Sequence, residues 1–272
     1  MPTDRTGDVE GLARREVIDV TGDAATPLQD RLAEEIPLAI HCDGEPLAVM
    51  MVSPGDLEDF AWGFALTELG LAADDLVSVA AQAVLEGIRL DLRTRDPRPA
   101  GEAAERRRWL PGRSGCGLCG SRSLEDVVRQ PEAVGRGSAI SRSALDAALE
   151  QLGQRQPLNA ATGAVHAAAW AGADGTLRLV REDVGRHNAL DKLVGAMRRD
   201  GVDPQSGFAL VTSRASYEMV VKAATAGIPL LAALSAPTAL AVDLAAGCGL
   251  TLLGFVRGDR HVVYSHPWRI GR

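Results

Sequence analysis

Two cysteines separated by two residues stand in a glycine-rich stretch, Gly115-Cys116-Gly117-Leu118-Cys119-Gly120. The thiolate is the form of cysteine that attacks sulfur and binds metals, and nearby cations lower its pKa. Five arginines are close to the pair in the sequence: Arg106, Arg107, Arg108, Arg113 and Arg122. This setting predicts persulfide chemistry on the pair, although a run of arginines is equally typical of a solvated surface.

Three other interpretations of the pair remain open: a loop that merely contains two thiols, a zinc site and a thioredoxin-like dithiol. Zinc needs two further ligands, and the suitably spaced histidine pair, His261 and His266, lies far beyond the roughly 12–15-residue gap of a zinc finger. A thioredoxin-like pair normally opens a helix, and the three glycines oppose a helix. We therefore expect no structural metal.

A second group of polar residues runs from Arg181 to Lys192. The pattern predicts that a strand ends near Val180 and a helix starts near Asn188, so that His187 and its charged neighbours crowd the corner between them. Such a corner is often only a hydrogen-bonded structural joint, but free N–H groups at a helix start can also bind phosphate. His166, at the start of another predicted strand, is interpreted as a core histidine.

A third group depends on the predicted sheet. In open parallel sheets, ligands bind beyond the carboxyl ends of the strands. The residues at those ends are Ser213 and Arg214, then Ser235, then Phe255, Val256, Arg257, Gly258, Asp259 and Arg260. Hydroxyls, arginines and helix starts at one edge suit a phosphorylated ligand. Ordinary helix capping explains Ser216 and Thr238 equally well.

Apolar periodicity predicts the elements that position these groups. In the first half we expect a hairpin of strands 37–42 and 47–52 around Asp43-Gly44, a helix capped by Ser53 with Pro54 in its first turn, and a strand at 88–92. In the second half we expect helix 141–153, strands 165–170 and 177–180, and helix 188–197. Strands at 208–211, 230–233 and 250–256 then alternate with helices 216–226 and 238–246.

The predicted fold is therefore α/β, with helices layered on a parallel or mixed sheet. We expect an arm with little structure over residues 1–30, a smaller α+β part over 31–135 and a larger α/β part over 136–272. The smaller part includes a long loop, 94–123, which carries the cysteine pair. Cys42 and Cys248 stand in apolar stretches and are predicted to be small buried side chains.

Composition excludes several classes of protein. The chain has 272 residues, 46% of them hydrophobic and 24% charged, as in ordinary globular proteins. A net charge of −7 argues against a nucleic-acid partner. The polar start, residues 1–16, resembles no export signal, so a cytoplasmic location without disulfides is expected. Prolines and glycines divide the apolar stretch 228–256 into a strand, a helix and a strand, so no membrane span is expected.

Taken in this order, the three groups resemble the FdhD family of formate dehydrogenase accessory sulfurtransferases. The resemblance runs from about Ile36 to Tyr264 and is most specific at 115–120, 181–195 and 216–258. It implies that the larger part is similar in fold to cytidine deaminases. The chemistry of those enzymes is not implied, because the His-x-Glu and Pro-Cys-x-x-Cys signature is absent from this sequence.

The resemblance also implies a function. Family members accept sulfur from a cysteine desulfurase and deliver it to the bis-guanine-dinucleotide molybdenum cofactor that formate dehydrogenase takes up. Cys116 would then hold the persulfide and Cys119 would assist. The run from Phe255 to Arg260 matches the family's cofactor-binding segment, so GDP is expected to bind as a mimic of the cofactor. A homodimer is implied too. The alternative is a non-catalytic chaperone of the same cofactor.

Overall fold

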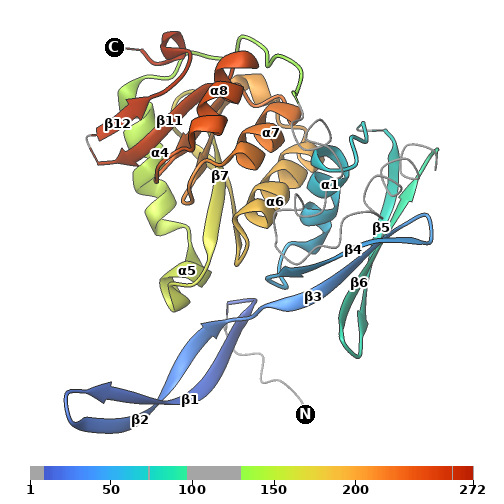
Figure 1. Ribbon diagram of the computed structural model, residues 1–272, viewed down its shortest axis with the longest axis vertical. Helices are drawn as coiled ribbons and strands as arrows, with labels where there is room; N and C mark the ends of the chain where they lie inside the picture. The colour runs from blue at the N-terminus through green and yellow to red at the C-terminus, as the bar shows by residue number, and fades with distance from the viewer. Residues whose placement is uncertain (1–8, 73, 97–129, 259, 272) are drawn as a thin grey trace.

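The computed structural model describes residues 9–72, 74–96, 130–258 and 260–271. The strands of these residues form three sheets, of two, four and six strands. In Figure 1 the six-stranded sheet and its helices make the larger part, the four-stranded sheet and α1 lie beside it, and the two-stranded ribbon projects away from both. The candidate ligand site is carried by the larger part.

The six-stranded sheet has the order β12-β11-β10-β9-β7-β8. Its three middle strands β11, β10 and β9 are parallel to one another, whereas β12, β7 and β8 run antiparallel to their neighbours. The predicted α/β fold with a mixed sheet is thus confirmed; the likeness to cytidine deaminases stays a prediction. The strands are β7 (His166–Gly172), β8 (Leu177–Asp183), β9 (Gly207–Val211), β10 (Leu230–Ala233), β11 (Thr251–Arg257) and β12 (Arg260–Val263).

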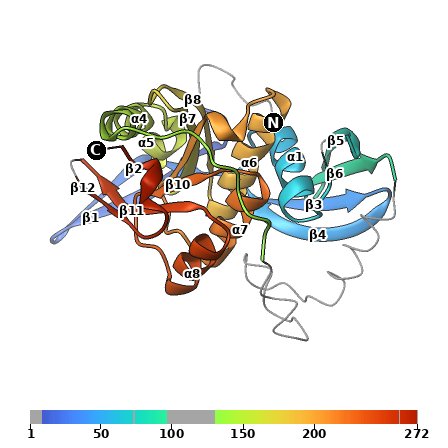
Figure 2. The ribbon, with the colours of Figure 1, turned by 90° about the horizontal axis from the view of Figure 1, so that it is seen from above.

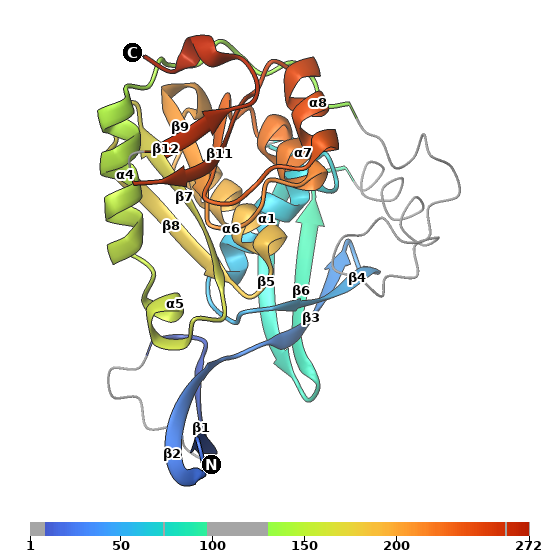
Figure 3. The ribbon, with the colours of Figure 1, turned by 60° about the vertical axis from the view of Figure 1, so that its left-hand side comes forward.

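Helices cover both faces of this sheet (Figure 3). One face packs against α6 (Arg186–Arg199), α7 (Tyr217–Thr225) and α8 (Ala239–Gly247), and the other against α4 (Arg142–Gln154). Alternation along the strands produces this division, since odd and even residues point to opposite faces. Short helices complete this part: α5 (Pro157–Thr162), η1 (Pro204–Ser206) and η2 (Pro267–Arg269).

The smaller part has its own hydrophobic core. Its sheet has the order β4-β3-β6-β5, in which β3 and β6 are parallel, and α1 covers one face. The predicted hairpin is confirmed, and Asp43 and Gly44 make its turn with positive φ. The elements are β3 (Ile36–Cys42), β4 (Glu45–Val52), α1 (Leu57–Thr67), β5 (Leu76–Val84) and β6 (Gly87–Thr94). The predicted burial of Cys42 and Cys248 is also confirmed.

The structure overturns the expectation of an arm with little structure for residues 12–30. Strands β1 (Leu12–Thr21) and β2 (Ala24–Ala33) form an antiparallel ribbon, and the N–H of Glu34 donates to the Gly11 carbonyl at its base. Most of its side chains are exposed, including Ile18 and Val20. A ribbon without a buried face leaves no strong apolar alternation in the sequence, so the sequence pattern does not reveal it.

The predicted start of the first helix is wrong. Asp56, not Ser53, occupies the N-cap position of α1, with φ of 56° and no side-chain capping hydrogen bond. Ser53 is buried and bonds across to the larger part instead, where its N–H donates to Asp183 and its hydroxyl accepts from the N–H of Val184. Long-range partners of this kind cannot be inferred from local sequence.

Helices α1 and α6 join the two parts (Figure 2). They approach closely because glycines face backbone: a Cβ at Gly63 would clash with the Asp191 carbonyl, and one at Gly195 with the Asp59 carbonyl. Beside this contact Lys222 of α7 is bound by Asp191 at 2.8 Å and Glu68 at 2.6 Å. Burial lowers the pKa of Lys222, but the two carboxylates raise it, and the net result is a raised pKa.

None of the helices in the described residues is long and apolar enough to span a membrane. The apolar stretch 228–256 folds as β10, α8 and β11, which confirms the predicted strand, helix and strand.

Candidate ligand site at the strand ends

The predicted catalytic residues, Cys116 and Cys119, lie outside the described residues, as do the arginines that flank them in the sequence. The expectation of a long loop over 94–123 likewise falls mostly on residues 97–129, which are not described. Among the described residues, no group of three or more histidine, cysteine, aspartate or glutamate side chains could hold a metal. The site that can be built from the structure is therefore the predicted ligand site.

The carboxyl ends of the parallel strands meet at one edge of the sheet, and backbone hydrogen bonds tie their loops together. The N–H of Leu234, after β10, donates to Val211 at the end of β9 at 2.9 Å, and the N–H of Phe255 in β11 donates to Ser235 at 3.1 Å. Ser213 follows β9 and Ser235 follows β10. The structure thus brings the predicted strand-end residues together, as the parallel topology requires.

A β-bulge shapes the end of β11. The register against β12 shifts between Gly254 and Arg257, and Phe255 within the bulge has a φ of +53°. A bulky residue with positive φ is an outlier, and such strain is concentrated at functional sites. The guanidinium of Arg260 lies 5.7 Å from the Phe255 ring centroid, a cation–π distance.

The predicted cofactor-binding segment is a hairpin whose residues differ in exposure. Arg257, Gly258 and Arg260 are exposed, whereas Val256 is 2% exposed and belongs to the core on the α4 side. The side chain of Val256 therefore cannot contact a ligand. Asp259 lies outside the described residues. The Nε of Arg257 donates to the Leu234 carbonyl at 3.2 Å, which directs this side chain towards the loop after β10.

Two helices begin at the same edge, and their first turns face each other. His187, in the first turn of α6, has its Nε2 2.8 Å from Oε2 of Glu218, in the first turn of α7, an ion-pair distance without hydrogen-bond geometry. The sequence pattern singles out His187 but not Glu218. Glu218 could have been found from the sequence, because it is an acidic residue in the first turn of a helix that was predicted to start at this edge.

Two further buried polar atoms of this edge have no hydrogen-bond partner within the described residues, Nε of Arg186 and Oγ of Ser216. Ser216 has the backbone of an N-cap, but its side chain makes no capping bond, whereas the Thr238 hydroxyl accepts from the N–H of Ala241 as expected. Burial, then Arg186 and His187, lower the pKa of His166, which favours the neutral form of its imidazole. Exposed arginines, helix starts and free buried donors suit an anionic ligand.

Most of the run from Arg181 to Lys192 serves a different purpose. Asp183 accepts from the N–H groups of Ser53 and Gly185, and it pairs with Lys192 at 2.7 Å, with both side chains 0% exposed. Nζ of Lys192 also donates to the Ser53 carbonyl. Asn188 bridges Asp183 and the Met51 carbonyl. These residues are a structural joint between the two parts, and only Arg186 and His187 belong to the candidate ligand site.

Known proteins resemble this chain over nearly its whole length. Residues 33–271 match the model of the FdhD/NarQ family. A protein named sulfur carrier protein FdhD from Xanthomonas euvesicatoria pv. vesicatoria (strain 85-10) is 53% identical over 268 residues, which is 98% of this chain and 93% of that protein. Its namesake from Cupriavidus necator is 52% identical over 246 residues, which is 89% of this chain and 84% of that protein.

A solved structure shows the same fold. The crystal structure of a protein described as a formate dehydrogenase accessory protein from Desulfotalea psychrophila superposes with a TM-score of 0.76 and covers 95% of this chain and 99% of its own. At 23% sequence identity this likeness concerns the fold alone. The family match and the relatives at about half identity extend over nearly the whole sequence. The chain belongs to the FdhD/NarQ family.

Proposed function

We propose that this chain is a sulfur carrier that holds a persulfide on Cys116 and passes its sulfur to the molybdenum cofactor destined for a formate dehydrogenase. The observation that carries the proposal is the 53% identity, over 98% of the chain, to a protein named sulfur carrier protein FdhD. The family match includes both Cys116 and Cys119. The sulfur donor that suits this chemistry is a cysteine desulfurase, which holds its sulfur as a persulfide.

The first step is a transfer of sulfur without net oxidation. The Cys116 thiolate attacks the outer sulfur of the donor's persulfide, the sulfur–sulfur bond of the donor breaks, and the donor cysteine leaves as a thiolate. The new persulfide on Cys116 then carries the sulfur. Arginines close in sequence favour the thiolate that this attack needs.

The second step releases the sulfur in the reduced form that a metal binds. The Cys119 thiolate attacks the inner sulfur of the Cys116 persulfide, a Cys116–Cys119 disulfide forms, and hydrosulfide leaves. The two electrons for the hydrosulfide come from the two cysteines, so a thiol reductant must afterwards restore the pair. The cofactor is the acceptor substrate, and it takes up the hydrosulfide.

The acceptor is proposed to bind at the strand ends. Its guanine dinucleotide arms carry pyrophosphates, and the exposed side chains of Arg214, Arg257 and Arg260 line the edge where α6 and α7 begin. Ser213, Ser235 and His187 add polar groups there. Guanidinium groups bind phosphate with two parallel hydrogen bonds, which suits a pyrophosphate. GDP is the corresponding small ligand.

The test is to replace each cysteine and to measure both sulfur and maturation. Cys116→Ser is expected to abolish formate dehydrogenase activity in cells and to remove the mass of the extra sulfur atom from protein incubated with desulfurase and cysteine. Cys119→Ser should keep that sulfur and lose activity only in part, because an external thiol can replace Cys119. Cys42→Ser is the matched control, since burial, with Asp43, raises the pKa of Cys42 to about 12 and keeps it a thiol.

Full maturation by the Cys116→Ser protein would overturn the proposal. Bound cofactor together with normal maturation, but no labile sulfur on the wild-type protein, would identify a non-catalytic chaperone instead.

A further inference from the structure

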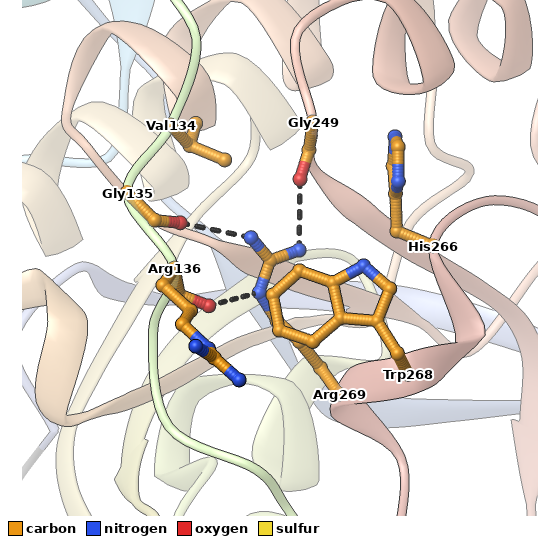
Figure 4. A pocket seen from close by; sticks show the side chains of 7 residues that line it. All are labelled: Val134, Gly135, Arg136, Gly249, His266, Trp268 and Arg269. Atoms are coloured by element: carbon orange, nitrogen blue, oxygen red, sulfur yellow. Dashed lines mark hydrogen bonds between the residues drawn. The ribbon is translucent and has the colours of Figure 1, made fainter.

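A pocket lies at the edge of the sheet opposite the strand ends. Its walls are residues 134–136, which precede α4, Gly249, which precedes β11, and the tail from His266 to Arg269 (Figure 4). Its volume is about 410 Å³. This lies within the range of about 300–1,000 Å³ typical of ligand pockets. Neither the cysteine pair nor the strand-end site contributes a residue to it.

The floor of this pocket is held in place by Arg269. Its guanidinium, in a residue only 1% exposed, donates to the carbonyls of Gly135, Arg136 and Gly249 and to the hydroxyl of Thr251, at 2.6 to 2.9 Å. The N–H of Val134 also donates to the Cys248 carbonyl. Arg269 thereby joins three segments that are distant in the sequence. Because this floor is already ordered before a ligand binds, little conformational entropy is lost on binding.

The pocket presents an aromatic surface and positive charge. The Trp268 ring stacks over the Arg269 guanidinium at 4.0 Å, yet the residue is 51% exposed, and the side chain of Arg136 is exposed beside it (Figure 4). The lining residues include two arginines and no acid. Within the described residues none of the hydrogen-bond partners of Arg269 is a carboxylate, so its charge is not neutralised. The chain as a whole has a net charge of −7, so the positive charge at this pocket is opposite in sign to the charge of the whole protein.

The chemistry favours a protein partner over a small molecule. Small-molecule sites direct several unpaired polar groups at the ligand. Here the carbonyls of the floor are already bound by Arg269, and the Nε2 of His266 already lies 2.9 Å from the Ala246 carbonyl oxygen. What remains is mainly the face of Trp268 and the side chain of Arg136, the residue types that dominate protein–protein hot spots. We propose that this pocket binds an acidic peptide segment of a partner protein, with an apolar side chain against Trp268 and a carboxylate at Arg136.

The test is the binding of a fluorescein-labelled peptide of alternating glutamate and phenylalanine, followed by anisotropy at low salt. We expect micromolar affinity for the wild-type chain and a loss of about tenfold or more in Arg136→Glu, since one charge-assisted hydrogen bond is lost and a repulsion gained. Trp268→Ala should weaken binding similarly. Arg136→Glu keeps the fold because the structural contacts of residue 136 come from its carbonyl.

Two matched controls carry the same changes elsewhere. Arg93→Glu reverses an exposed charge on β6, and Leu85→Ala removes a side chain that is 97% exposed; both should bind the peptide like the wild type. Equal affinity of wild type and Arg136→Glu would overturn the proposal, and so would equal binding of a lysine–phenylalanine peptide. If phenylacetate displaced the peptide at the same concentration as the unlabelled peptide, the pocket would be a small-anion site and the protein partner would be refuted.

Discussion

At the scale of single residues, the charge pair of Asp183 and Lys192 connects the two parts of the molecule. Both side chains are fully buried, and each also bonds to the backbone of Ser53 in the smaller part. A buried pair adds little net stability over an apolar replacement, because desolvation offsets the attraction. Losing one partner is a different matter, because the other charge then remains buried without compensation.

Lys192→Met is therefore expected to lower the free energy of unfolding by about 3–5 kcal/mol. Asp183→Asn/Lys192→Met, which leaves no unpaired charge, should be less destabilised than Lys192→Met alone. Urea denaturation of the three proteins measures the difference. A double variant at least as unstable as Lys192→Met would show that the hydrogen bonds of Asp183, and not its charge, hold the joint.

The strand-end arginines supply a second prediction at this scale. Arg257 and Arg260 are exposed on either side of the turn between β11 and β12, and neither has an ion-pair partner in the described part of the chain. If each reaches a phosphate, Arg257→Ala or Arg260→Ala alone should weaken GDP binding by roughly 10- to 100-fold, since one charge-assisted contact contributes about 1.5–3 kcal/mol, and the double variant Arg257→Ala/Arg260→Ala should weaken it more than either single change. Calorimetry measures the GDP affinity of the wild type and of the variants, and ADP should bind to the wild type less well than GDP.

The exposed Arg93 of β6 supplies the control for that experiment, because Arg93→Ala should leave GDP affinity unchanged. Equal GDP affinity in the wild type and the double variant would place the nucleotide elsewhere.

At the scale of elements, the close crossing of α1 and α6 depends on glycine. The carbonyls of Asp59 and Asp191 occupy the space where side chains of Gly195 and Gly63 would lie. Because backbone cannot move aside as a flexible side chain can, any larger residue must separate the helices and open the joint between the two parts.

Gly63→Ala should thus lower the free energy of unfolding by about 1–3 kcal/mol or more, as overpacking does. Gly153→Ala is the matched control: Gly153 is an exposed residue of α4, a Cβ there would meet nothing within 4 Å, and alanine should stabilise the helix by roughly 0.5–1 kcal/mol. Thermal or urea unfolding of both variants measures these changes in the free energy of unfolding. A neutral effect of Gly63→Ala would mean that α1 and α6 can move apart without cost.

At the scale of the whole molecule, the β1–β2 ribbon touches the body of the protein mainly where β2 meets α5. It contributes no residue to any of the three hydrophobic core clusters, and Ile18 and Val20 are 61% and 66% exposed. Two strands alone are at best marginally stable in water. The ribbon therefore depends on the body of the protein, while the body does not depend on the ribbon.

A chain that begins at Glu34 should consequently remain folded, with a melting temperature within about 2–4 °C of the full chain, the shift expected for roughly 1 kcal/mol in a protein of this size. Circular dichroism during heating measures this. A cooperative transition lost on truncation would contradict the separation of ribbon and body.

Much of the fold could be predicted from the sequence alone. Short apolar runs located the strands of both larger sheets except β5 and β12, and apolar periodicity located α4, α6, α7 and α8. Parallel topology then predicted that the carboxyl ends of β9, β10 and β11 meet at one edge, which the hydrogen bonds from Leu234 to Val211 and from Phe255 to Ser235 confirm. These successes share a cause: a strand covered on both faces, such as β9 or β10, is an unbroken apolar run, whereas a helix covered on one face shows a periodic apolar stripe.

Only the tertiary structure decided which polar residues meet. Ser53 looked like a helix cap and is instead a partner of Asp183, 130 positions away. His187 was predicted to lie among several charged residues at one corner, and its Nε2 in fact lies beside the carboxylate of Glu218. Asp183 and Lys192 instead form the buried pair that joins the two parts. The positive φ of Phe255 arises from a β-bulge that no local sequence pattern predicts. Hydrogen bonds and ion pairs between distant segments leave no period in the sequence, because each needs only one suitable residue on either side.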